Sequence, residues 1–171
     1  MKKLLSIAMI VLLSACASQT TQPDGDEMAG TGDGMSGSEL MGSESGRPSY
    51  FNQLNDPSNI LSQRSVYYDY DSYTVKGEYR ELVLAHARFL RDNPSASVIL
   101  QGNTDDRGSR EYNLALGQRR ADSVRNMMTL AGARDVQIES VSLGEEKPRA
   151  YGSGETAWSQ NRRTDIVYRG E

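Results

Sequence analysis

Four stretches of the chain carry the pattern of β-strands. Residues 66–71 (VYYDYD) alternate in character and are rich in aromatic side chains, and residues 97–103 (SVILQGN) form a short apolar run. Residues 136–143 and 164–168 (TDIVY) are two further stretches of this kind. Short runs of β-branched and aromatic residues are typical of strands. We therefore expect four strands, and we expect the second one to be buried.

Two longer stretches carry helical periodicity. In residues 74–92, apolar side chains recur every three or four positions, and Asn93-Pro94 ends the pattern because the residue before a proline avoids the helical region. A second helix is expected over about 109–131. Gly132 follows it, and glycine is the residue that most often terminates helices.

The order of the elements predicts the fold class. Two shorter helical segments complete the set: one begins at Asp56-Pro57, a favourable cap and first residue, and one covers about 155–160. The order is then β-α-β-α-β-(α)-β. Strands that alternate with long helices favour a sheet with parallel pairs and with helices packed on one face. We predict an α+β domain over residues 56–171, an α/β sandwich with a mixed sheet.

The N-terminus has a different pattern. It reads MKKLLSIAMIVLLSAC, two lysines followed by an apolar run that is shorter than the roughly 20 residues of a membrane-spanning helix. Residues 1–15 are therefore predicted to be a secretory signal peptide. The sequence Leu13-Ser14-Ala15-Cys16 resembles a bacterial lipobox, which implies cleavage before Cys16 and attachment of lipid, including palmitate, to it. The alternative is an ordinary signal peptide with a chance cysteine.

Residues 16–55 are predicted to be a flexible acidic tether. They are rich in Gly, Ser, Thr and acidic residues and have few large apolar side chains, so they cannot bury enough area to offset the entropy lost on ordering. Residues 32–37 match the pattern G-x-G-x-x-G. No strand precedes them and no helix follows, so we interpret the match as an accident of composition rather than a dinucleotide site.

Composition excludes some classes of function. The 171 residues carry a net charge of −4, which is not the basic footprint of a nucleic-acid-binding protein. The single cysteine excludes an intramolecular disulfide. The hydrophobic fraction of 37% is that of an ordinary globular domain with extensions.

Charged residues are expected to meet at one edge of the predicted sheet. Asp71 ends the first strand, Asp105 follows the second, and Arg120 lies at the border of the apolar face of the second helix. Loops after strand ends are favoured ligand sites in α/β folds. Two carboxylates and a partly desolvated guanidinium suit a zwitterion, since carboxylates bind an ammonium and arginine binds a carboxylate through a two-pronged contact.

Purely structural roles are open for the same residues. Asp71 could cap the first helix, Asp105 could stabilise its own turn, and Arg120 could simply pair with either acid.

Four motifs in order resemble one domain family: "VYYDYDSY", "GNTDDRGSREYNLALGQRRADSV", "VSLGEEKP" and "NRRTDIVY". They are similar to those of the OmpA-like peptidoglycan-binding domain, and the similarity covers about residues 56–168. The resemblance implies binding of meso-diaminopimelate in the peptidoglycan stem peptide. It implies that Asp105 holds the ammonium of this residue and that Arg120 holds its carboxylate.

The resemblance also assigns further residues. It implies that the pocket is lined by Tyr70, Asp71, Thr104, Arg107, Asn113 and Leu116. Tyr70 stands where the family often has Phe, and Asn103 stands where many relatives have His, so no contact is expected from the Asn103 side chain. The late Asn161-Arg162-Arg163 is interpreted as structural support near the site. Arg119 is expected to be a surface residue.

Partners and location follow from the same resemblance. Lipoproteins of this family bind the periplasmic propeller protein TolB, which implies TolB and other Tol proteins as partners. The residue after Cys16 is Ala17 and not Asp, which in this family implies sorting to the outer membrane. The expected function is a tether that joins the outer membrane to peptidoglycan, and the alternative is a module that chiefly binds TolB.

An enzyme and a metal site are the other classes considered. The only histidine, His86, occupies an apolar helical position, and no G-x-S-x-G motif occurs. An arginine near Asp71 and Asp105 would keep both ionised and leave no general acid. Asp69-x-Asp71 begins like a calcium loop but lacks the required Gly and Glu. We therefore expect no catalysis, no metal and no cofactor apart from the covalent lipid.

Overall fold

The computed structural model describes residues 51–170. The predicted signal peptide, Cys16, the G-x-G-x-x-G match and most of the predicted tether lie outside this range. The last five residues of that tether, 51–55, form helix α1, and Phe51 and Leu54 are buried in the core. The folded part therefore begins earlier than the expected boundary at residue 56, because two apolar side chains in this segment have a core to enter.

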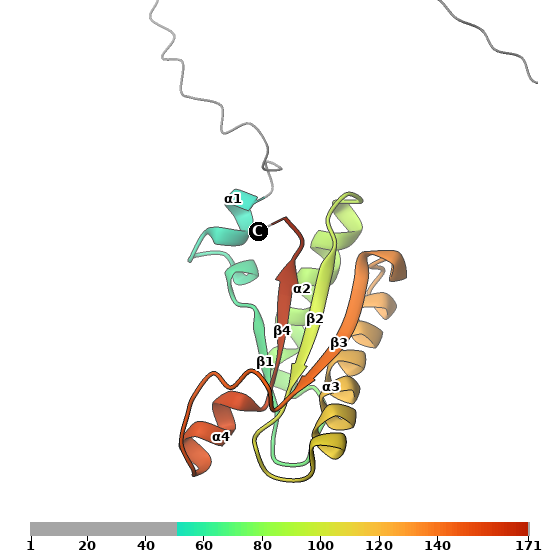
Figure 1. The fold of residues 1–171 in the computed structure, drawn as a ribbon. Helices are drawn as coiled ribbons and strands as arrows, with labels where there is room; N and C mark the ends of the chain where they lie inside the picture. Colours follow the sequence, from blue (N-terminus) through green and yellow to red (C-terminus); the bar gives the residue numbers. More distant parts are fainter. Residues whose placement is uncertain (1–50, 171) are drawn as a thin grey trace, which may run out of the picture. The chain divides into compact units, whose positions relative to one another are not determined.

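The described domain contains four strands and several helices, in the predicted order (Figure 1). The elements are α1 (Phe51–Asn55), η1 (Ile60–Ser62), β1 (Ser65–Tyr67), α2 (Gly77–Asp92), β2 (Val98–Asn103), α3 (Arg110–Leu130), η2 (Asp135–Gln137), β3 (Ile138–Gly144), α4 (Glu155–Asn161) and β4 (Arg163–Tyr168).

The strands form one mixed sheet in the order β1-β4-β2-β3. The last strand lies in the centre and pairs antiparallel with both β1 and β2, whereas β2 and β3 are parallel. Strands β1 and β2 therefore run in the same direction on either side of β4. Their C-terminal ends reach the same edge of the sheet, as the sequence predicted.

Helices α2 and α3 cover one face of the sheet, behind it in Figure 1. The core lies between these layers. It contains apolar residues from both long helices and from the inward positions of the strands, among them Val83, Leu90, Val98, Met128 and Ile166. The prediction of an α+β sandwich with a mixed sheet and helices on one face is confirmed.

Helix α3 approaches strand β2 through two glycines. A Cβ on Gly102 would lie 1.9 Å from the backbone oxygen of Gly117, and a Cβ on Gly117 would lie 2.3 Å from Oγ of Ser142. Real Cβ contacts are not this short, so only glycine permits the packing at both positions. The contact places the N-terminal half of α3 directly beside the end of β2.

Two local predictions were wrong in detail. The first strand was expected over 66–71 but ends at Tyr67, and Asp71 adopts a positive φ of 52° that a strand cannot accommodate. The helical turn expected to begin at Asp56-Pro57 is η1, and it is capped by Asn59; the Asp56 carboxylate instead accepts hydrogen bonds from Ser58.

Within residues 51–170, no helix combines the length and the apolar character that crossing a membrane requires.

Candidate functional site

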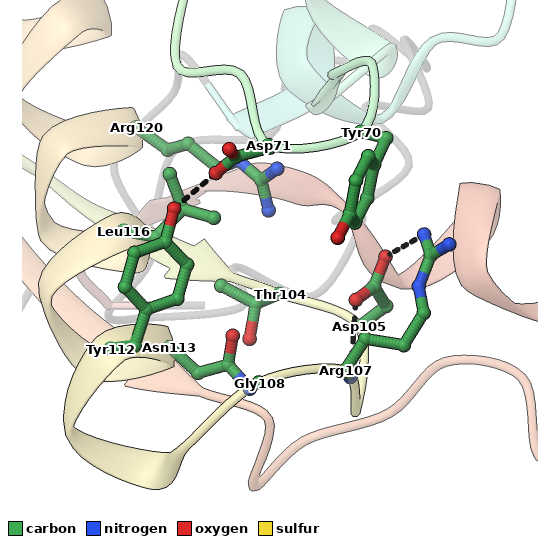
Figure 2. A pocket seen from close by; sticks show the side chains of 10 residues that line it. All are labelled: Tyr70, Asp71, Thr104, Asp105, Arg107, Gly108, Tyr112, Asn113, Leu116 and Arg120. Carbon is green, nitrogen blue, oxygen red and sulfur yellow. Dashed lines mark hydrogen bonds and ion pairs between the residues drawn. The ribbon is translucent and has the colours of Figure 1, made fainter.

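A pocket opens where β1 and β2 end and α3 begins (Figure 2). It encloses about 150 Å³. Residues from three segments line it: the loop after β1, the loop after β2, and one face of α3. They are Tyr70, Asp71, Thr104, Asp105, Arg107, Gly108, Tyr112, Asn113, Leu116 and Arg120.

Asp105 is a buried and ionised carboxylate. Its Oδ2 accepts hydrogen bonds from Nη2 of Arg107 at 2.6 Å and from Nη1 of Arg162 at 3.2 Å. Its Oδ1 accepts the backbone N–H of Arg107 at 3.2 Å. Burial raises the pKa of the Asp105 carboxyl, but the hydrogen bonds from Arg107 and Arg162 outweigh this effect, so the net pKa lies below its ordinary value. Such a group cannot serve as a general acid at neutral pH.

Arg120 is a buried cation whose side-chain hydrogen bonds within residues 51–170 all go to backbone carbonyls. Its side chain leaves α3 and is 0% exposed. It donates to the carbonyl oxygens of Ser72 at 2.8 Å, Asn103 at 2.8 Å and Asp69 at 3.4 Å. Burial lowers the pKa of the Arg120 guanidinium to about 10, so it remains charged at neutral pH. Arg119, its neighbour, is exposed, in agreement with its predicted place on the surface.

Asp71 does not cap a helix. Helix α2 begins at Gly77, and its N-cap is Lys76. The Asp71 carboxylate instead accepts a hydrogen bond from the hydroxyl of Tyr112 on α3, as Figure 2 shows. The structure therefore removes helix capping as an explanation for this residue and places its carboxylate at the pocket.

Arg107 lies between two aromatic rings. Its guanidinium carbon is 4.1 Å from the ring centre of Tyr70 and 4.0 Å from that of Trp158 on α4. Cations bind favourably over aromatic faces at such distances. Arg107 is thereby held in the orientation in which it also reaches Asp105.

Helix α4 supports the pocket from behind Asp105. Arg162, which directly follows this helix, bonds Glu155 as well as Asp105, and its Nε donates to the carbonyl oxygen of Tyr68 at 3.1 Å. Asn161 and Arg163 bond the backbone of the 147–150 segment. The interpretation of Asn161-Arg162-Arg163 as structural support is confirmed. Arg162 in addition donates a hydrogen bond to the Asp105 carboxylate.

The remaining pocket residues supply polar and apolar contacts. Thr104 is buried, and its hydroxyl has no hydrogen-bond partner among the described residues. Buried polar groups are normally paired, so this hydroxyl can serve a ligand. Asn113 is buried and bonds Glu145, while Leu116 adds an apolar wall. The side chain of Asn103 bonds Gln101 and Asp165 instead of lining the pocket.

All eight residues predicted to line the site do so. The sequence reasoning missed Gly108 and Tyr112. Both lie inside the motif that carried the resemblance, but a turn glycine and a half-exposed tyrosine give no signal of their own. His86, rejected as a catalyst, bonds Tyr168 and the carbonyl of Gln63 in the core, and it does not line the pocket.

Comparison with known proteins gives consistent results along the chain. The model of the OmpA family matches residues 67–162. The peptidoglycan-associated lipoprotein of Haemophilus influenzae is 37% identical over 167 residues, which cover 98% of this chain and 97% of that protein. The one from Pasteurella multocida is 47% identical over 110 residues, which cover 63% of this chain and 73% of that protein.

Solved structures agree with these relatives. The crystal structure of the peptidoglycan-associated lipoprotein from Burkholderia pseudomallei is 53% identical, with a TM-score of 0.67, and the match covers 68% of this chain and 99% of that one. The C-terminal domain of Helicobacter pylori MotB gives a TM-score of 0.57 at 19% identity, over 62% of this chain and 83% of that one. The second likeness concerns the fold alone.

Proposed function

Because the chain belongs to the OmpA family and, within it, to the peptidoglycan-associated lipoproteins, we propose that its pocket binds meso-diaminopimelate of the peptidoglycan stem peptide. We propose a binding role without catalysis, since the relatives are named for their association with peptidoglycan. Binding is non-covalent in this proposal. The side-chain end of the ligand carries an ammonium and a carboxylate on one carbon, so it needs a site that offers both charges.

The observation that supports the proposal most strongly is the lack of a carboxylate partner for Arg120 among residues 51–170. A fully buried guanidinium keeps its charge, yet among residues 51–170 no carboxylate forms an ion pair with it. A buried charge without a counter-ion is costly. A carboxylate that enters the pocket would supply the missing counter-ion.

The donors and acceptors fit the two charges of the ligand. A guanidinium has five N–H groups, and three of those of Arg120 are used by carbonyls, which leaves two for a ligand carboxylate. Within the described range, Oδ1 of Asp105 accepts only the backbone N–H of Arg107, so it can accept a further bond from an ammonium. Leu116 offers apolar surface to the methylene carbons of the ligand.

The proposed cellular role is a tether. In this proposal, lipid on Cys16 holds the outer membrane, the domain lies in the periplasm and binds the cell wall, and the segment between them provides reach. About 34 residues of flexible chain span roughly 30 Å. Many copies on one membrane face one wall, so avidity can offset a weak single-site affinity. As part of the Tol-Pal system, such a tether would serve envelope integrity and cell division.

The identity of the ligand can be tested with a peptide that lacks the carboxylate proposed to bind Arg120. The described core lies within residues 51–168, so a fragment of residues 43–171 retains it. We expect a soluble stem peptide with meso-diaminopimelate to bind this fragment at least about tenfold more tightly than the same peptide with lysine, which lacks the carboxylate for Arg120. Calorimetric titration measures both affinities.

Matched arginine variants complete this test. Arg119→Ala should keep the preference for meso-diaminopimelate, whereas Arg120→Lys should lose most of it, because one ammonium cannot replace the two-pronged contact of a guanidinium. Equal affinity of the parent for the two peptides would contradict the proposed ligand.

TolB is the proposed protein partner, and it provides the alternative function. Tyr70 at the pocket rim is 63% exposed and lies over the Arg107 guanidinium. Tyrosine and arginine are enriched in protein interfaces, which favours this rim as part of a docking surface. If the two ligands share the rim, the soluble stem peptide should displace TolB. Simultaneous and independent binding would reject a shared site.

A further inference from the structure

The position of Tyr112 is fixed by the start of helix α3. Oγ of Ser109 caps the helix by accepting the backbone N–H of Tyr112 at 3.2 Å. Gly108, just before this cap, has a φ of 109°. A Cβ on it would lie 3.4 Å from the ring of Tyr112, so the ring lies directly beside this turn. The turn and the cap together determine where the tyrosine hydroxyl can reach.

The hydroxyl reaches a carboxylate that the backbone alone would not hold in place. Asp71 is exposed, and its φ of 52° lies in a region that side chains other than glycine occupy at a cost. Tyr112, 41 positions later in the chain, donates its hydroxyl hydrogen to Oδ1 of Asp71 (Figure 2). Within the described residues, this bond joins the loop after β1 to helix α3.

The flanking residues of the loop are held by Arg120. Its guanidinium bonds the carbonyl oxygens of Asp69 and Ser72, one on each side of Asp71. The backbone on both sides of Asp71 is thus attached to the buried cation, and only the side chain of Asp71 remains to be oriented. Tyr112 provides that orientation through one oxygen and leaves Oδ2 without a hydrogen-bond partner among residues 51–170.

We propose that Tyr112 is a positioning residue for the ammonium of the ligand: its hydroxyl holds the Asp71 carboxylate at the pocket that Asp105 also lines. This inference rests on the proposed function. An exposed carboxylate on a loop otherwise turns freely into solvent, and ordering it in advance lowers the entropy lost on binding. Tyr112 itself is 47% exposed and lies outside the core, so the fold does not require its hydroxyl.

The test is a double-mutant cycle on the 43–171 fragment, read by NMR titration with the soluble meso-diaminopimelate stem peptide. Tyr112→Phe removes only the hydroxyl, and Asp71→Gly removes the carboxylate with a residue that adopts the positive φ without strain. We expect Tyr112→Phe alone to weaken binding by about threefold to tenfold, the size of a partly exposed hydrogen bond to a charged group. In the Asp71→Gly background, the same change should have almost no effect.

The control is Tyr151→Phe, which removes a hydroxyl from a tyrosine that is 88% exposed and does not line the pocket. It should leave binding unchanged. An equal loss from Tyr112→Phe in both backgrounds, or no loss in either, would overturn the positioning role. Failure of the parent fragment to bind the peptide would instead count against the proposed function itself.

Discussion

Single residues of this domain show how burial changes the behaviour of a charge. Asp105 and Arg120 are both buried and both remain ionised, but for different reasons. Asp105 has two arginines as hydrogen-bond donors, whereas the acceptors for Arg120 among residues 51–170 are all carbonyls. Within this range the acid is paired with cations, and the base has no carboxylate partner. This asymmetry leads us to expect that the ligand carboxylate provides much of the specificity.

His86 gives a prediction about stability at low pH. Burial lowers its pKa to about 4, below the value of about 6.5 that it has in an unfolded chain. Between these values only the unfolded state binds the proton, so the histidine contributes a loss of stability as the pH falls from about 6.5 to 4. That loss reaches at most about 3 kcal/mol and levels off below pH 4.

Urea unfolding at pH 7 and pH 4.5 measures this effect. His86→Leu should be less stable at pH 7, since the hydrogen bonds of His86 to the Tyr168 hydroxyl and to the carbonyl oxygen of Gln63 are lost. It should also lose less stability on acidification than the parent does. An identical pH dependence of the two proteins would show that His86 is not the responsible group.

At the scale of elements, the packing of α3 on β2 determines the geometry of the pocket. Asn113, Leu116 and Arg120 lie on α3 and line the pocket together with Thr104 and Asp105 from the loop after β2. The glycine contact described above sets the separation of the two elements. A change in that separation would move both sides of the pocket relative to each other.

We therefore expect Gly117→Ala to be destabilising. The new methyl group would lie 2.3 Å from Oγ of Ser142 and 2.9 Å from the backbone oxygen of Gly102, and only the serine side chain can turn away. Overpacking of this kind costs about 1–3 kcal/mol. The matched control is Gly77→Ala at the first residue of α2, where no atom lies within 4 Å of the new Cβ. Urea unfolding should separate the two variants; equal stability would contradict the tight contact.

At this scale, features set by local residues could be predicted from the sequence, and features set by long-range contacts could not. The ends of the two long helices were predictable because Pro94 and Gly132 act locally on the backbone. The early end of β1 was not, since β1 pairs with β4, and β4 begins at Arg163 opposite Tyr67. The central place of β4 likewise depends on pairing between strands far apart in the chain. The pocket residues were found through a motif, whereas Tyr112 acquires its role only from the fold.

At the scale of the whole domain, the two ends of the described chain lie opposite the pocket. A Cβ on Gly170 would lie 3.6 Å from the ring of Phe51, so both ends of the described chain meet at one place. The loops that form the pocket lie at the other end of the sheet, as Figure 1 shows. In the proposed tether, the domain would therefore be held at the end opposite the pocket, which suits a link between two surfaces.

The central claim is that the domain holds the cell wall through a pair of opposite charges, and co-sedimentation with purified peptidoglycan sacculi tests it most directly. The 43–171 fragment is compared with Asp105→Ala, Arg120→Ala and the control Arg119→Ala, after thermal unfolding has shown that each variant is folded. We predict that the parent and Arg119→Ala sediment with sacculi and that the other two remain in solution. Sedimentation of folded Asp105→Ala or Arg120→Ala to the same extent as the parent would contradict the account.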